Sequence, residues 1–112
     1  MKKKYTVLIL YRATHLWLGL TREERSIIFD KELAPLLTKY NKSLNVRFFD
    51  SEAFHAHTSD FIIVETADLN QYYYFMEHLR DTSLFGKPYI ELNNIIMGLE
   101  DGFKDFESNE IK

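Results

Sequence analysis

Three residues close together near the start of the chain have side chains that could bind and act on a small molecule. Arg12 ends an apolar run over residues 5–12, and His15 and Trp17 follow shortly after it. An arginine fork can hold a carboxylate or a phenolate, and histidine, with an ordinary pKa of about 6.5, can act as a general acid or base. A structural interpretation competes with this one: Arg12 pairs with Glu65 or Asp60, and Trp17 fills the edge of the core.

Two carboxylates, Glu65 and Glu91, lie within otherwise apolar segments that we expect to be strands. Burial would raise their pKa values, and a carboxyl group with a raised pKa in a pocket can transfer protons. Arg47 offers the alternative, because a cross-strand ion pair explains a strand carboxylate without any chemistry. The candidate catalytic residues are His15 and Glu65.

The consecutive tyrosines 72–74 resemble an aromatic box. Helical geometry separates Tyr74 from the other two, so packing in the core or at an interface is the preferred interpretation of the run. Tyr73 belongs to the apolar stripe of the expected helix and could also reach a ligand. The candidate ligand-binding residues are Arg12, Trp17 and Tyr73.

The histidines give a weak signal for metal or haem binding. His55 and His57 are two residues apart and would share one face of a strand, with Asp60 or Glu65 as a third ligand. They fall in a polar segment, residues 50–59, where exposed histidines without a ligand are the commoner case. We predict no metal and no cofactor, and keep a haem enzyme using His55, His57 or His78 as a third hypothesis.

Composition and motifs exclude several classes of protein. There is no cysteine, hence no disulfide or thiolate chemistry, and no Gly-rich phosphate loop, nucleophile elbow or zinc signature. The net charge is −3 and the basic residues are scattered singly except at Lys2, Lys3 and Lys4, which argues against nucleic-acid binding. No apolar run approaches the roughly 20 residues that span a bilayer. We expect a cytoplasmic protein that binds neither nucleic acid nor membrane.

The pattern of apolar residues predicts strands over 5–12, 44–49, 60–66 and 89–97 and helices over 21–40 and 68–80. Thr21 and Glu24 form a capping box that starts the first helix, and Pro35 should kink or break it near Ala34. The second helix should bury Leu69, Tyr72, Tyr73, Met76 and Leu79. The order strand, helix, strand, strand, helix, strand is the ferredoxin-like βαββαβ pattern, an α+β fold.

In this topology the first and third strands are central and the fourth lies beside the first. Residues 1–98 would form a single domain, and residues 99–112 an acidic extension packing on it. Lys2, Lys3 and Lys4 would then lie close to Glu100, Asp101 and Asp105.

The predicted sheet has more apolar surface than two helices can cover. Leu8 and Leu10 alternate with Val7 and Ile9, so large apolar side chains occupy both faces of a strand. Helices on one face leave the other exposed, and monomers seldom expose so large an apolar patch. We therefore predict a homodimer through the open sheet face, as in dimeric α/β barrels.

Several segments resemble the darcynin family: residues 14–20 (Thr-His-Leu-Trp-Leu-Gly-Leu), 47–54 (Arg-Phe-Phe-Asp-Ser-Glu-Ala-Phe), 79–81 with 88–91, and 98–106. The family has no described activity, so the resemblance implies no catalytic residues. More loosely, the order of elements is similar to dimeric α/β-barrel proteins, which include cofactor-free monooxygenases, lactone isomerases and haem-handling enzymes.

These observations lead to two hypotheses of different class. The first is a homodimer that binds an apolar or aromatic small molecule between sheet and helices, as a cofactor-free monooxygenase or isomerase. It predicts a pocket of several hundred cubic ångströms near Arg12, His15 and Trp17. The alternative is a non-catalytic assembly or interaction module, in which Trp17, Phe29 and Tyr73 fill the same space.

Overall fold

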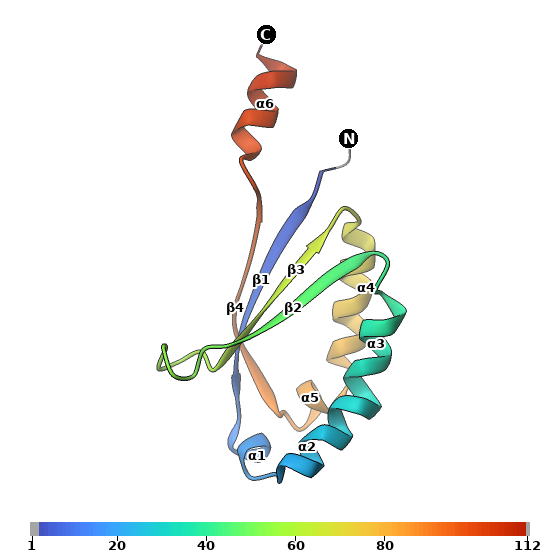
Figure 1. The fold of residues 1–112 in the computed structure, drawn as a ribbon, viewed down its shortest axis with the longest axis vertical. Helices are drawn as coiled ribbons and strands as arrows, with labels where there is room; N and C mark the ends of the chain where they lie inside the picture. Colours follow the sequence, from blue (N-terminus) through green and yellow to red (C-terminus); the bar gives the residue numbers. More distant parts are fainter. Residues whose placement is uncertain (1–2, 112) are drawn as a thin grey trace.

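The computed structural model describes residues 3–111, which form one four-stranded sheet and the helices that flank it (Figure 1). The elements in chain order are β1 (Tyr5–Ala13), α1 (His15–Leu18), α2 (Arg22–Ile28), the π-helical η1 (Phe29–Leu33), α3 (Ala34–Lys39), β2 (Leu44–Asp50), β3 (Asp60–Thr66), α4 (Leu69–Arg80), α5 (Ser83–Gly86), β4 (Ile90–Leu99) and α6 (Gly102–Glu110). The predicted ferredoxin-like α+β fold is confirmed.

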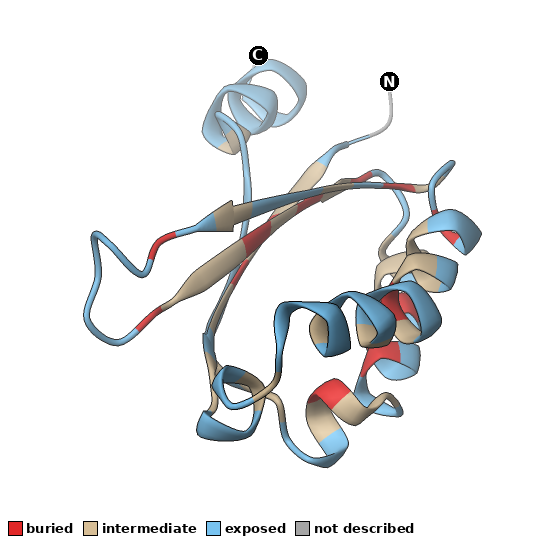
Figure 2. Cartoon of the chain, turned by 60° about the horizontal axis from the view of Figure 1, so that its bottom comes forward, coloured by how far each residue is buried: buried red, intermediate tan, exposed pale blue. Residues whose placement is uncertain are grey.

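The sheet has the strand order β2-β3-β1-β4, and each neighbouring pair is antiparallel. The predicted central strands β1 and β3 are therefore confirmed, and β2 and β4 form the edges. The main helices, α2 to α4, cover one face of this sheet only (Figure 2).

Strand alternation decides which side chains enter the core. Val7 and Ile9 of β1 and Ile62 and Val64 of β3 face the helices and are buried. The residues between them, such as Leu8 and Ile63, point to the open face. No segment within residues 3–111 forms a second layer over that face (Figure 2).

The first helical region is one rod with a change of geometry in its middle. Its start is as predicted, because Thr21 and Glu24 form the complete capping box. The break expected near Ala34 is also present, as a π-helical turn in which the Ala34 amide donates to the Phe29 carbonyl. Pro35 has no amide to donate, and the wide turn just before it lets the chain continue as α3.

The buried face of α4 differs from the predicted stripe in one residue. Tyr73 is 59% exposed, whereas Phe75 is fully buried together with Met76 and Leu79. Tyr72, Phe75, Met76 and Leu79 have the spacing i, i+3, i+4, i+7, which is one face of a helix. Including Tyr73 in the core stripe was therefore wrong, and Phe75 takes its place.

The end of the chain leaves the sheet. β4 leads into α6, which lies beyond the end of the sheet (Figure 1), and Phe103 and Phe106 on it are 61% and 55% exposed. Among the described residues, Leu99 pairs with Tyr5 at the end of the sheet, and an exposed ion pair between Lys3 and Asp105 joins α6 to the start of the chain. None of the helices between residues 3 and 111 has the length and apolar character needed to cross a bilayer.

Candidate functional site

A cavity of about 300 Å³ lies between the helices and the sheet, at the end where β1 leads into α1. The sheet contributes its floor, and the helices and η1 its roof. The lining residues are mainly apolar or aromatic: Tyr11, Ala13, Trp17, Phe29, Leu33, Phe48, Phe49, Ile62, Phe75, Leu79, Leu84 and Ile90, joined by Asp50 and Asp60. A pocket was predicted near Arg12, His15 and Trp17. The observed cavity is lined by Trp17 but not by Arg12 or His15, and the region is not filled solid.

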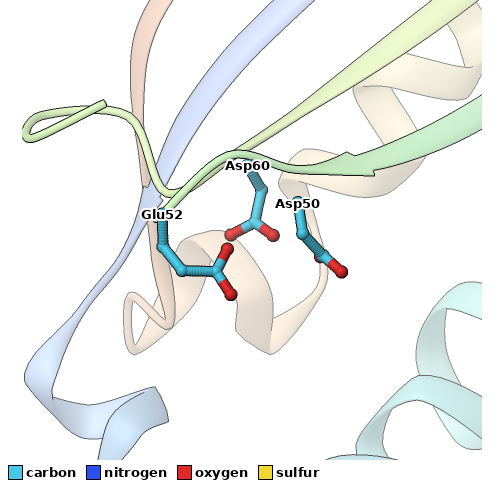
Figure 3. A group of neighbouring side chains, drawn as sticks. All are labelled: Asp50, Glu52 and Asp60. Atoms are coloured by element: carbon cyan, nitrogen blue, oxygen red, sulfur yellow. The ribbon is translucent and has the colours of Figure 1, made fainter. Parts of the chain in front are cut away.

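The polar end of the cavity is a row of side chains across three strands. Tyr11 of β1 is opposite Asp60 of β3, and Asp60 is opposite Asp50 of β2. Because residues directly opposite each other in a sheet share a face, all three side chains face the helices. Glu52 joins this group, and carboxylate oxygens of Asp50, Glu52 and Asp60 lie within 4.8 Å of one another (Figure 3).

The crowding of carboxylates changes the proton affinity of Asp60. Its pKa is raised, first by burial and then by its hydrogen bond with Asp50 and the negative charges of Glu52 and Asp50, against the opposing effect of the Ser59 hydroxyl. The Ser59 hydroxyl donates to Asp60 Oδ2 at 2.6 Å and accepts from the Ala13 amide at 2.8 Å. Asp60 is therefore a fixed carboxyl group that keeps its proton to higher pH than an exposed aspartate does.

Tyr11 remains a neutral phenol over the ordinary pH range. Burial raises its pKa, and the negative charges of Asp60 and Asp50 raise it further. A neutral phenol can donate a hydrogen bond, whereas ionised carboxylates only accept. The polar end of the cavity thus offers one phenolic donor, Tyr11, beside the carboxyl groups of Asp50 and Asp60.

Trp17 is held in the cavity wall by contacts with Tyr89 and Arg25. Its ring packs edge-on against Tyr89 at 5.5 Å, and the Arg25 guanidinium lies 5.9 Å from its centroid. Arg25 also donates to the carbonyls of Trp17 and Leu18, at 3.1 and 3.0 Å. α2 therefore fixes α1, and with it the indole ring.

Phe29 and Phe48 form the solvent-facing part of the cavity lining. Their rings meet edge-to-face with 6.4 Å between centroids, one from η1 and one from β2. They are 41% and 44% exposed, although both line the cavity. This pair therefore lies where the cavity lining, the helix layer and the sheet meet solvent.

Of the five predicted site residues, only Trp17 lines the cavity. Arg12 is exposed on the open side of the sheet, since it follows Tyr11 and strand residues alternate. His15 is exposed on α1, and Tyr73 on the outer side of α4. Glu65 lies on the open face, where Arg47 and Asn45 contact it at 3.5 and 3.3 Å. The structural interpretation offered for Glu65, an ion pair with Arg47, is the one observed.

The polar residues of the cavity were missed, although the sequence contains a signal for them. Tyr11 continues the alternation of Val7 and Ile9, which places it on the core side of β1. Asp50 and Asp60 are the residues at which a β2–β3 hairpin pairs next to its loop. Pairing the two predicted strands residue by residue would have placed the two aspartates opposite each other.

The histidines do not form a metal site with the predicted partners. His55 Nδ1 accepts from the amides of His57 and Thr58 at 3.3 and 2.9 Å, so the loop backbone uses this ring nitrogen. The carboxylates of Asp50, Glu52 and Asp60 are the group within the described residues whose spacing suits a hard divalent cation. Two of these three side chains are exposed, and acidic groups in such positions commonly hold no ion.

Solved structures of low sequence identity share this fold. A haem-binding protein from Thermus thermophilus superposes with a TM-score of 0.81 at 14% identity, over 96% of this chain and 45% of that one. Chlorite dismutase from Candidatus Nitrospira defluvii in complex with imidazole gives 0.76 at 17% identity, over 88% and 40%. This chain spans less than half the length of either protein.

Sequence comparison gives the family directly. Darcynin 1 of Acinetobacter baumannii is 37% identical over 91 residues, which are 81% of this chain and all of the relative. Darcynin of Chromobacterium violaceum is 38% identical over 76 residues, 68% of this chain and 95% of the relative. Residues 1–110 match the family described as "Darcynin, domain of unknown function". The resemblance found in the sequence is confirmed, and this chain belongs to the darcynin family.

Proposed function

We propose that this chain binds an apolar or aromatic small molecule in the cavity between its sheet and helices. The observation that carries the proposal is the cavity of about 300 Å³, which lies at the lower end of the range for small-molecule sites, roughly 300–1,000 Å³. Its walls supply aromatic and aliphatic contacts, and Tyr11, Asp50 and Asp60 supply polar contacts at one end.

The acidic end selects against anionic ligands. A ligand carboxylate placed there would meet Asp50 and Asp60 and would have to be desolvated against their charge. A protonated amine would be attracted by the same groups, and a hydroxyl group could donate to them. The proposed ligand therefore has an apolar body and a head that is cationic or neutral.

Haem is the cofactor to test against this cavity, because one of the similar structures is a haem-binding protein. The lining residues do not fit it. They include no histidine for the iron and no lysine or arginine for the propionates, which would instead meet Asp50 and Asp60. Tyr11 is the one lining residue of a type that ligates haem iron as an anion, and its raised pKa opposes that anion.

Proton transfer is the reaction that the polar end supports best. Asp60 has a raised pKa and lies next to the Tyr11 phenol, so the two groups can exchange a proton with a ligand at the end of the cavity. This favours isomerisation over oxygenation among the reactions expected for the fold. It also makes Asp60, rather than His15 or Glu65, the proposed acid–base residue.

Binding is tested with three ligands that differ in the head alone: 4-phenylbutylamine, 4-phenylbutanol and 4-phenylbutyrate. Trp17 is the single tryptophan and lines the cavity, so its emission reports occupancy, with calorimetry as a second readout. We expect saturable binding of the amine and the alcohol, and binding of the carboxylate at least about 10-fold weaker, which corresponds to about 1.4 kcal/mol.

Filling the cavity should abolish this binding. Ala13 lines the cavity, so Ala13→Leu places three additional carbon atoms in its space, whereas Ala53→Leu makes the same change at an exposed loop position. We expect at least about 10-fold weaker binding of 4-phenylbutanol for Ala13→Leu and no change for Ala53→Leu. Equal affinities for the two variants would contradict the proposed site.

We propose further that the open face of the sheet joins a second copy of the chain. Leu8, Leu10, Phe61 and Ile63 form an apolar surface there, with no covering layer from the described residues. Sedimentation should give a species of twice 13.4 kDa. Ile63→Lys should reduce it to the monomer, and Ile27→Lys, on the outer side of α2, should not.

A further inference from the structure

The last part of the chain exposes apolar side chains that nothing in the described part of this chain covers. We call residues 95–111, the far half of β4 with α6, the C-terminal arm. Met97, Leu99, Phe103 and Phe106 on it are 52%, 39%, 61% and 55% exposed. A chain end that merely needed to stay in water would carry polar residues at these positions.

The accessible surface of the whole chain is larger than that of a compact protein of the same mass. A 13.4 kDa monomer is expected to expose about 6,500 Å², and this chain exposes 8085 Å². The excess of about 1,600 Å² is twice the roughly 800 Å² that each partner buries in a standard interface. The radius of gyration, 16.3 Å against about 13 Å for a compact chain of this length, shows the same extension.

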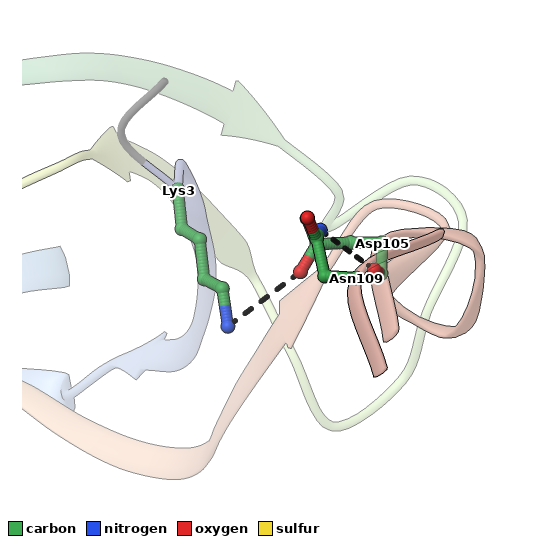
Figure 4. A network of polar contacts seen from close by, with 3 residues as sticks. All are labelled: Lys3, Asp105 and Asn109. Carbon is green, nitrogen blue, oxygen red and sulfur yellow. Dashed lines mark hydrogen bonds and ion pairs between the residues drawn. The ribbon is translucent and has the colours of Figure 1, made fainter. Parts of the chain in front are cut away.

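α6 has little within its own chain to keep it folded. It has nine residues, and helices shorter than about 12 residues are marginal in water without tertiary contacts. Lys3 Nζ lies 3.7 Å from Asp105 Oδ2 (Figure 4). The predicted proximity of the basic start and the acidic end is therefore confirmed for this pair. Lys2 lies outside the described residues. Both side chains of this pair are more than half exposed, so it contributes little.

We infer that the C-terminal arm is exchanged between two copies of this chain: β4 stays paired with β1 of its own chain, and the exposed apolar side chains of each arm pack against the other copy. A two-fold symmetric pair covers both arms with the same surface, so no third component is required. Area supports this partner, because the excess surface is large enough for the roughly 800 Å² that each partner buries in a standard interface. Charge does not select it, since Arg12 and Arg47 on the open face of the sheet are balanced by Glu91 and Glu65. The inference rests on the proposed homodimer, but it makes a separate claim about what holds the arm.

The decisive experiment places a photo-crosslinking residue, p-benzoylphenylalanine, at position 106 of the full chain. A mixture of ¹⁴N-labelled and ¹⁵N-labelled copies then identifies by mass whether each cross-link joins two copies or one. We expect cross-links between copies. A dimer in sedimentation whose cross-links all lie within one copy, or which forms none, would overturn the arm exchange and leave the sheet-face dimer standing. A monomer would overturn both.

A matched pair of variants measures the contribution of the arm. Phe103→Asp changes an apolar residue on α6, and Ile27→Asp changes one of similar exposure, 58% against 61%, on α2. We expect Phe103→Asp to raise the dimer dissociation constant about 30-fold or more, as for a central interface residue, and Ile27→Asp to leave it unchanged. Equal constants for the two variants would overturn the inference.

Discussion

Tyr11, Asp60 and Asp50 form one row because each is opposite the next on neighbouring strands of the sheet. None of the three would be unusual alone. Together they place a phenol and two carboxyl groups at one end of an apolar cavity, where burial and nearby negative charges raise the pKa values of Tyr11 and Asp60. The pairing register of the three strands therefore brings these groups together, and no local sequence motif does so.

The raised pKa of Asp60 predicts how stability depends on pH. Because its folded pKa lies above its unfolded value, ionisation costs the folded state more than the unfolded one. The contribution of Asp60 to the free energy of unfolding is fully present below its unfolded pKa and is lost as pH rises through its folded pKa. Asp60→Asn removes this loss and keeps an acceptor for the Ser59 hydroxyl.

We therefore expect Asp60→Asn to be more stable than the wild type at neutral pH and equal to it near pH 3. Urea unfolding over a pH series at fixed protein concentration measures the difference. Asp30→Asn, at an exposed position of η1, is the control and should follow the wild-type profile. An Asp60→Asn protein less stable than the wild type at neutral pH would contradict the assignment.

The elements themselves could largely be predicted from the sequence. Alternating and helical apolar periods located β1, β2, β3, β4 and α4, and the capping box located the start of α2. The π-helical form of η1 could not be predicted, because Pro35 requires an interruption without specifying its geometry. The prediction of the site residues was wrong for a related reason. The site depends on which residues of neighbouring strands are opposite each other, whereas Arg12 was chosen because it is close to His15 and Trp17 in the sequence.

The corrected face of α4 gives a direct test at the scale of the element. Phe75 is fully buried and packs edge-to-face on Tyr40 at 5.9 Å, whereas Tyr73 is 59% exposed. Phe75→Ala should lower the free energy of unfolding by about 3–5 kcal/mol, since it removes a large side chain from the core. Tyr73→Ala should lower it by no more than about 0.5 kcal/mol.

Denaturant unfolding followed by far-UV circular dichroism compares these two variants. The contrast between them matters more than either value, because both remove an aromatic ring from the same helix. A larger loss for Tyr73→Ala would show that its ring is covered in solution, for example by a partner, and would contradict its placement on an outer surface.

At the scale of the whole molecule, the two uncovered apolar surfaces have different origins. The open sheet face follows from the fold, since helices α2 to α4 lie on the other side. The C-terminal arm arises where β4 ends opposite Tyr5, the first residue of β1, because α6 follows there and lies beyond the end of the sheet (Figure 1). The sequence predicted the first surface from strand alternation. It could not predict the second, because a helical period does not say what the helix packs against.

The arm exchange predicts that α6 is stable only while two copies are associated. At protein concentrations above the dimer dissociation constant, the amides of residues 102–110 should exchange slowly with deuterium. On dilution below that constant they should exchange at the rate of an unfolded peptide, because nine residues cannot hold a helix without packing.

α4 is the internal control: it buries Phe75, Met76 and Leu79 in its own chain, so its protection should change far less. Hydrogen exchange measured by mass spectrometry over a dilution series, with sedimentation of the same samples, separates the cases. Protection of α6 that persists in a monomeric sample would mean that the arm is held within its own chain.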